Sequence, residues 1–322
     1  MRKGIYLSCF IVIFIGIECL AERSEFPTDW SAWVKEVREE AIADGIRPEV
    51  FDKAFKGVKL NRRVQHFDRT QPETRLTFLK YRSSRIDAYR ITLGRKEYRK
   101  HANVLEKVGA DYGVNPCMIT AIWGIESSYG RFKGDFPVIQ SLATLAFEGR
   151  RTDFFRKELF IALHVLNGDH VRLEDFKGEW AGASGHSQFL PSSWQKYAVD
   201  YNKDGRRDIW GTLDDVFASI ANYLKMNGWR ADEPWVAEAS LPLDFDESLF
   251  GFENSRTVSE WLQMGVKIKK NVPHDLKAAI IMPYGGPALM AFNNFKVIKR
   301  YNNSTFYAGS VGYLADRICA GI

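Results

Sequence analysis

The sequence has few cysteines. Of the four in its 322 residues, Cys9 and Cys19 belong to an N-terminal segment that we expect to be removed, which leaves Cys117 and Cys319. Two cysteines cannot build a disulfide framework, so the fold must depend mainly on a hydrophobic core. The remaining two either pair across most of the chain or stay as buried thiols, and both alternatives are open at this stage.

The sequence also lacks a strong excess of either charge. It has 45 Lys and Arg against 40 Asp and Glu, a net charge of +5, and no basic run longer than a few residues. This balance argues against nucleic acid as a partner. With 45% hydrophobic and 26% charged residues, the composition is typical of a compact soluble protein.

Several catalytic motifs are missing as well. The six histidines form no HExxH site, and the sequence contains neither a GxSxG nucleophile turn nor a glycine-rich phosphate-binding loop. No internal repeat or low-complexity stretch is present. Any catalytic activity must therefore use groups other than these.

The N-terminus has the pattern of a secretory signal peptide over residues 1–21. A basic start precedes an almost wholly apolar run at 6–17, and residues 19–21 offer a small-x-small cleavage site. A membrane anchor is the alternative, but a run of about a dozen residues is shorter than the ~20 that span a bilayer. Glu18 disfavours lipoprotein processing at Cys19. We therefore expect an exported, periplasmic protein in which no later segment spans a membrane.

The rest of the sequence has mainly helical periodicity, and start signals accompany it: Thr28 or Asp29 before the first helix, Pro116 in the first turn of another, and Thr152 as the N-cap of a third. The predicted helical regions are residues 30–41, 73–112 (as more than one helix), 116–128, 152–167 and a helix that starts near Asp215. Beyond Pro234, short apolar runs at 235–241 and 278–292 favour strands and turns. These patterns predict a mainly α fold with a small β portion late in the chain.

Glu126 is the most informative single residue. It ends the helix that begins at Pro116, and that helix is apolar on nearly every face, which indicates that it is buried. A carboxyl group in apolar surroundings has a raised pKa and stays protonated near neutral pH, as a general acid must. The alternative is a helix-end Glu that turns to solvent or pairs with an arginine.

The segment from Asp200 to Asp208 has the pattern of a calcium-binding loop. Hard cations need several oxygens from one tight turn, and Gly205 allows such a turn. The oxygen ligands at loop positions 1, 3, 5 and 7 would come from Asp200, Asn202, Asp204 and the carbonyl of Arg206. Position 12 is Gly211, so Asp214 or Asp215 would have to close the site from a longer loop. A plain polar turn is the alternative.

Four ordered segments resemble the membrane-bound lytic transglycosylase B family, whose members cut peptidoglycan glycan strands. They are residues 121–130, 136–155, 180–193 and 200–224, and residues 300–308 resemble the family too. The resemblance implies a lysozyme-like helical core. It also implies a catalytic region over 22–322, with the core at about 74–230 and a C-terminal part, 231–322, that returns to the cleft.

By this resemblance, Glu126 is the sole catalytic acid/base, and the product carries a 1,6-anhydro-N-acetylmuramic acid end. No second catalytic carboxylate is needed, because the substrate supplies the nucleophile. The residues implied to bind substrate are Tyr81, Arg150, Arg151, Gln188, Phe189, Tyr223, Tyr301 and Asn302. The implied ligands of a structural Ca²⁺ are Asp200, Asn202, Asp204, Arg206 and Asp215, and no organic cofactor is expected. Peptidoglycan glycan strands are the expected partner, and proteins of cell-wall synthesis or division are further candidates.

Some of the residues implied to bind substrate have a purely structural role as the alternative. Arg150 and Arg151 would otherwise form structural ion pairs, and the tyrosines would otherwise be packing residues. The chain also departs from the family at Glu179, where Ser is usual, and at Ser184, where Met is usual. A Glu179 side chain in the cleft would raise the pKa of Glu126 further or repel substrate carboxylates. Two other functions therefore stay open: an inactive wall-binding or scaffolding protein, and a hydrolytic muramidase that uses Glu179 or Asp153 as a second carboxylate.

Overall fold

The computed structural model describes residues 29–70 and 76–322. The predicted signal peptide, Thr28 and the first residues of the 73–112 region lie outside these residues. Within them, no helix combines the length and the apolar character that crossing a membrane requires. The fold is mainly α with a small sheet late in the chain, as predicted.

The helices and strands follow the sequence patterns closely. Asp29 caps the first helix through Ala32 N–H at 2.9 Å. Thr152 is the first residue of its helix rather than the N-cap, a position that Arg151 occupies. The α-helices are α1 Trp30–Ala43, α2 Pro48–Phe55, α3 Arg62–Arg69, α4 Phe78–Arg85, α5 Ala88–Lys100, α6 Ala102–Tyr112, α7 Pro116–Ser127, α8 Val138–Glu148, α9 Thr152–Asn167, α10 Pro191–Tyr197, α11 Leu213–Met226, α12 Val258–Gln263, α13 Asn293–Tyr301 and α14 Thr305–Cys319.

The strands form two small antiparallel sheets. β1 Phe136–Pro137 pairs with β2 Lys177–Gly178. The later strands are β3 Val236–Ser240, β4 Arg256–Thr257, β5 Lys267–Ile268, β6 Lys277–Ile281 and β7 Leu289–Ala291, in the order β4-β6-β7-β3-β5. This five-stranded sheet has a core of its own around Trp261, Ile280 and Phe292, all of them fully buried.

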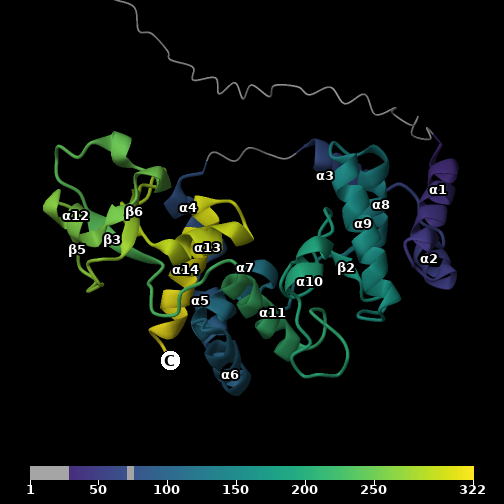
Figure 1. Cartoon of the computed structure of the whole chain (residues 1–322), viewed down its shortest axis with the longest axis horizontal. Helices are drawn as coiled ribbons and strands as arrows, with labels where there is room; N and C mark the ends of the chain where they lie inside the picture. Colours follow the sequence, from purple (N-terminus) through teal and green to yellow (C-terminus); the bar gives the residue numbers. More distant parts are fainter. Residues whose placement is uncertain (1–28, 71–75) are drawn as a thin grey trace, which may run out of the picture.

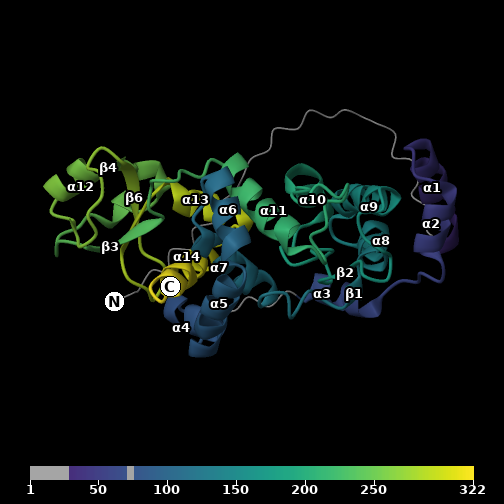
Figure 2. The ribbon, with the colours of Figure 1, turned by 90° about the horizontal axis from the view of Figure 1, so that it is seen from below.

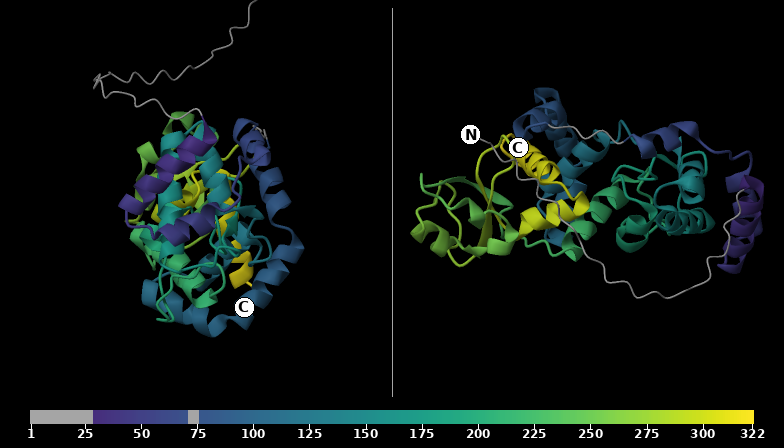
Figure 3. Two further views of the ribbon diagram at one scale, coloured as in Figure 1. Left: turned by 90° about the vertical axis from the view of Figure 1, so that its right-hand side faces the viewer. Right: turned by 90° about the horizontal axis from the view of Figure 1, so that it is seen from above.

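The molecule is elongated (Figure 1). Helices α1–α3 and α8–α10 lie toward one end, and the five-stranded sheet with α12 lies at the other. Between them are α4–α7, α11, α13 and α14. The same order appears from below (Figure 2) and from above (Figure 3), with α7 and α14 in the middle region. Helices from both halves of the sequence therefore meet there, and they carry most of the predicted site.

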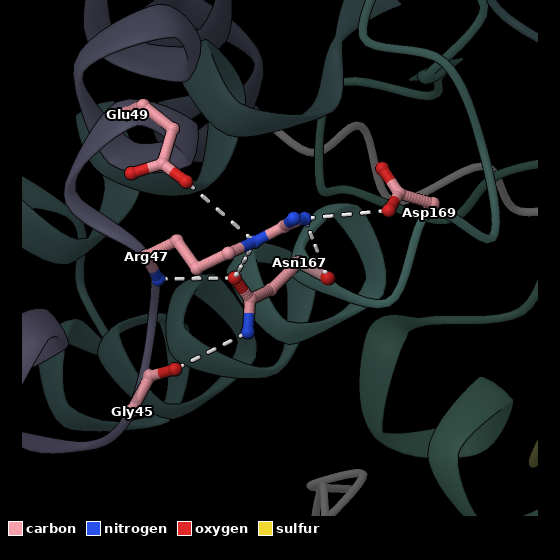
Figure 4. Close-up of polar contacts among 5 residues, drawn as sticks. All are labelled: Gly45, Arg47, Glu49, Asn167 and Asp169. Atoms are coloured by element: carbon pink, nitrogen blue, oxygen red, sulfur yellow. Dashed lines mark hydrogen bonds and ion pairs between the residues drawn. The ribbon is translucent and has the colours of Figure 1, made fainter.

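A polar cluster attaches the α1–α2 connection to the end of α9 (Figure 4). The guanidinium of Arg47 donates to the side-chain oxygen and the carbonyl of Asn167, at 3.1 and 2.9 Å, and lies 3.3 Å from the Asp169 carboxylate. The Asn167 amide in turn donates to the carbonyl of Gly45 at 3.2 Å. Because these contacts lie at one end of the molecule, they stabilise the N-terminal helices rather than the predicted site.

Helix α7 is the buried centre of the middle region. Asn115 caps it by accepting from Cys117 N–H at 2.8 Å, and Pro116 is its first residue, as the sequence predicted. It packs against α14, α5, α6 and α11. A disulfide between Cys117 and Cys319 joins the start of α7 to the end of α14. This result decides between the two alternatives that the sequence left open for these cysteines.

Candidate active site

Glu126 lies in the last turn of α7 and is partly exposed. Its Oε1 accepts a hydrogen bond from the Tyr307 hydroxyl. Burial raises the pKa of Glu126 from its ordinary value of 4.5 to about 7, and the hydrogen bond from Tyr307 opposes part of that increase. A substantial fraction of Glu126 is therefore protonated at neutral pH, as the apolar helix predicted.

Arg90 from α5 lies at the same helix end. Its guanidinium donates to the carbonyl of Gly124, which also accepts from the backbone N–H of Ser128, the C-cap residue of α7. A cation at a helix C-terminus is favourable, because the carbonyl dipoles point toward it. Arg90 thus stabilises the turn that carries Glu126.

Aromatic residues predicted to bind substrate form a cluster beside Glu126. The ring of Tyr301 lies 4.6 Å from that of Tyr223, 5.7 Å from that of Phe189 and 6.4 Å from that of Tyr307. The Tyr301 hydroxyl donates to the carbonyl of Ser187 at 2.6 Å. Burial and the nearby Glu126 carboxylate raise the pKa of Tyr301 well above its ordinary value. Phe189, Tyr223 and Tyr301 are therefore packed against one another, with Tyr301 nearest to the acid.

Three further predicted residues lie near this cluster or on its border. Gln188 has a left-handed backbone, φ +50°, and its side-chain amide donates to the carbonyls of Gly185 and Lys133 at 2.8 and 3.2 Å. Tyr81 in α4 affects the pKa of Tyr307 through charge. Asn302 is exposed and directly follows α13.

Arg150 and Arg151 lie in the turn between α8 and α9, in the end region that holds α1–α3 (Figure 1). The Nε of Arg150 is 3.6 Å from the carboxylate of Asp68, a residue that is 4% exposed. The Arg151 guanidinium lies 5.2 Å from the rings of both Phe154 and Phe155. Arg150 thus makes the structural ion pair named above as its alternative role. Because both arginines remain exposed, substrate binding stays a prediction for them.

Tyr307 is a site residue that the sequence reasoning did not select. In the sequence it belongs to the segment 300–308 that resembles the family, but no role was predicted for it. In the structure it contacts Glu126 directly. Ser304 caps α14 by accepting from Tyr307 N–H at 3.2 Å. Since the turn from Tyr301 to Ser304 joins α13 to α14, it directs both tyrosines to one place. The paired Tyr301 and Tyr307 flanking an Asn-Asn-Ser turn are the signal that would have identified this residue.

The two residues that depart from the family pattern, Glu179 and Ser184, lie in different surroundings. Glu179 is exposed in the loop after β2, and its pKa is raised by partial burial of the carboxyl group and by the nearby Asp135. The Glu126 pKa is raised by burial alone. Ser184 is buried, and its hydroxyl accepts from the Trp210 indole at 3.3 Å. In this structure the two departures leave the surroundings of Glu126 intact.

The predicted metal loop connects α10 to α11. Asp200 accepts from the backbone N–H groups of Asp204 and Gly205 at 3.1 and 2.9 Å, and the side chains of Asn202 and Asp204 are 3.0 Å apart. Gly205 has φ +90°, which the tight turn requires. Three oxygen-bearing side chains therefore come from a single turn, as a hard cation prefers.

Asp215 lies in α11, behind the loop that carries the other predicted ligands. It is fully buried, and its carboxylate accepts from the backbone N–H groups of Tyr201 and Asp208 at 2.7 and 2.9 Å. It therefore connects the two ends of the loop to α11. Within residues 29–70 and 76–322, no three His, Cys, Asp or Glu side chains are grouped as metal ligands would be. The calcium site, with the carbonyl of Arg206 as a further ligand, remains a prediction.

The fold around this acid is the lysozyme-like fold of lytic transglycosylases. The chain belongs to the Transglycosylase SLT domain family, whose model matches residues 29–316. It is 30% identical over 246 residues to the membrane-bound lytic murein transglycosylase B of Escherichia coli K12, covering 75% of this chain and 67% of that protein.

Solved structures give the same picture. SltB3 from Pseudomonas aeruginosa, in complex with NAG-anhNAM-pentapeptide, has a TM-score of 0.88 and 41% identity, over 91% of this chain and 80% of that one. The Escherichia coli lytic transglycosylase Slt35 in complex with calcium has a TM-score of 0.79 and 26% identity, over 89% and 93%.

Proposed function

We propose that this protein is a lytic transglycosylase that cleaves the β-1,4 bond between N-acetylmuramic acid and N-acetylglucosamine in peptidoglycan. Glu126 first protonates the glycosidic oxygen. It then accepts the proton of the muramoyl 6-hydroxyl as that oxygen attacks C1. One C–O bond breaks, one forms, and Glu126 ends in its starting protonation state. The product carries a 1,6-anhydro end, and no water is consumed.

The protonation state of Glu126 supports this proposal most directly. With a pKa of about 7, one group can act both as the acid and as the base near neutral pH. A hydrolytic muramidase needs a second carboxylate close to the first. Among the residues that the structure describes, no second carboxylate contributes to the pKa of Glu126. The substrate-assisted reaction is therefore favoured over hydrolysis, and the 41% identity to SltB3, whose structure holds NAG-anhNAM-pentapeptide, favours an active enzyme over an inactive scaffold.

We propose that the aromatic cluster binds the sugar rings. Tyr301 is partly exposed beside the acid, and the buried Phe189 and Tyr223 pack behind it. The side-chain oxygen of Gln188 and the exposed Asn302 supply polar contacts. Tyr81 lies on the border of this cluster. Arg150 and Arg151 are assigned to the lactyl or peptide carboxylates, since both guanidinium groups are exposed.

We propose that the Asp200 loop binds Ca²⁺ in a structural role. Oxygens of Asp200, Asn202, Asp204 and the Arg206 carbonyl are the ligands, and Asp215 holds the loop closed from behind. The calcium complex of Slt35 supports this assignment. We place the protein in the periplasm, after removal of residues 1–21, because a peptidoglycan substrate lies outside the cytoplasm.

Digestion of purified peptidoglycan tests the function. The fragments are analysed by mass spectrometry for a 1,6-anhydromuramyl end, which is one water lighter than a hydrolysed end. We expect anhydro ends from the wild type and from Glu148→Gln, an exposed control at the end of α8, and none from Glu126→Gln. Reducing ends would establish a hydrolase instead, and wall binding without cleavage would establish a scaffold.

A further inference from the structure

The turn that follows Glu126 has an unusual backbone. Ser128, Tyr129 and Gly130 are consecutive residues with φ of +50°, +61° and +82°. Left-handed backbone is unfavourable for residues other than glycine, and two such residues in succession persist only where the surroundings hold them. The segment is well placed to affect catalysis, because it begins two residues after the acid.

His186, which lies outside the helix, contacts this turn together with two residues of α7. The Ser127 hydroxyl donates to the carbonyl of His186 at 2.8 Å and accepts from Gly130 N–H at 3.1 Å. The Trp123 indole donates to Nδ1 of His186 at 2.9 Å. The imidazole ring lies directly against Gly130, where an added Cβ would be 2.2 Å from Cε1 of the ring. One histidine therefore contacts Ser127 through its carbonyl, Trp123 through Nδ1 and Gly130 through the edge of its ring.

The chemistry of the indole fixes the state of His186. An indole N–H can only donate, so Nδ1 must be unprotonated, and the neutral ring carries its proton on Nε2. Burial and the nearby Lys133 lower the pKa of His186 to about 4, which agrees with a neutral ring. His186 is itself fixed in place, because its backbone N–H donates to the carbonyl of Ile209 at 2.9 Å.

We propose that His186 is a positioning residue for Glu126: by accepting from Trp123 and Ser127 it keeps the strained turn closed and the carboxyl group in line with Tyr307. The inference rests on the proposed function of Glu126, and His186 itself need not touch the substrate. A displacement of about 1 Å at a reacting group costs on the order of 100-fold in rate, so loosening this turn should reduce kcat.

A matched pair of substitutions separates positioning from packing. In His186→Asn, the side-chain carbonyl takes the place of Nδ1 and can accept from Trp123. In His186→Gln, the polar group reaches the place of Nε2 instead and leaves the indole without its acceptor. We expect kcat for release of anhydro fragments to fall by roughly 10- to 100-fold in His186→Gln. His186→Asn should retain most of it, and KM should change little in either variant.

Trp123→Phe provides a second test if the His186 variants fold poorly. It removes the donor while it keeps an aromatic ring, so it should lower kcat to a similar extent. The double variant Trp123→Phe/His186→Gln should be no slower than the slower single variant, because both remove one interaction. The matched control is His164→Gln on α9, where His164 contacts Asp44 at 2.7 Å at the other end of the molecule. It should leave kcat unchanged.

The pH–rate profile gives a readout that simple loss of stability would not move. Glu126 is faced by Tyr307 from α14 and Tyr301 from α13, and its pKa is raised by burial. If the turn loosens in His186→Gln, water reaches the carboxyl group, its pKa falls, and the alkaline limb moves to lower pH. In His186→Asn the limb should stay in place.

The outcomes separate the two proposals. If the wild type releases anhydro fragments while folded His186→Gln and Trp123→Phe both keep full kcat and an unchanged alkaline limb, the positioning role is wrong and the function stands. If the wild type gives reducing ends, the proposed transglycosylase function is wrong. The positioning role is then tested by measuring kcat for hydrolysis in the same variants. If the wild type cleaves nothing, both proposals are wrong, since positioning requires a reaction.

Discussion

Replacing Glu126 with Gln should stabilise the protein above neutral pH while it abolishes activity. The pKa of this carboxyl group is about 7 in the folded protein and about 4.5 in the unfolded chain, so folding favours the protonated form. Its contribution to stability is complete below pH 4.5 and is lost as the pH rises through 7. A difference of about 2.5 units corresponds to about 3 kcal/mol, an upper value because the carboxyl group is partly exposed.

Urea unfolding of the wild type and of Glu126→Gln at pH 5, 7 and 8.5 measures this effect. All other ionisable groups are common to both proteins, so the difference between their free energies of unfolding isolates Glu126. It should change by up to about 3 kcal/mol in favour of the variant between pH 5 and 8.5. Glu148→Gln, at an exposed site, should give a flat difference. The reasoning would be refuted if the difference for Glu126→Gln also stayed constant with pH, or if this variant were less stable than the wild type at pH 8.5.

Three further predictions follow from particular contacts. Tyr307→Phe removes a hydrogen bond that lowers the Glu126 pKa, so the alkaline limb of the pH–rate profile should move to higher pH by about one unit. A shift of this limb to lower pH would contradict the prediction. Cys117→Ser opens a loop of 202 residues and should cost roughly 2–5 kcal/mol in urea unfolding, whereas an unchanged midpoint would mean that the disulfide is absent in solution. Excess Ca²⁺ should raise the Tm of the wild type but not of Asp200→Asn/Asp204→Asn, and an equal response in both would disprove the loop site.

Local sequence patterns predicted much of the helical part of the fold. The cap at Asn115, Pro116 in the first turn and the uninterrupted apolar run after it indicated where α7 begins and that it is buried. Glu126 was then singled out as the one carboxyl group in such a helix, with a Glu that turns to solvent or pairs with an arginine as the alternative. These inferences needed only residues within about a dozen positions of one another.

Contacts between distant residues could not be predicted in the same way. The hydrogen bond between Tyr307 and Glu126 joins residues 181 positions apart, and the Trp123–His186 bond joins residues 63 apart. Neither residue of such a pair carries a local sign of its partner. The resemblance named the segments that contain His186 and Tyr307, but only the packing of α14 and of the loop before α10 against α7 shows what these residues contact.

The antiparallel contact of α7 and α14 explains how one acid is held with so little local support. The disulfide joins the start of α7 to the end of α14, and Glu126 meets Tyr307 where α7 ends and α14 begins. The helix pair is thus fixed at both ends, by a covalent bond and by the catalytic contact. Beyond Glu126 the chain enters two non-glycine left-handed residues, Ser128 and Tyr129, whose backbone N–H groups donate to the carbonyls of Gly124 and Trp123 in α7 at 3.1 and 3.3 Å. The loop around His186 contacts the same turn from the other side, through Ser127 and Gly130. The helices therefore determine where the acid lies, and the proposed role of the loop is to fix how it is oriented.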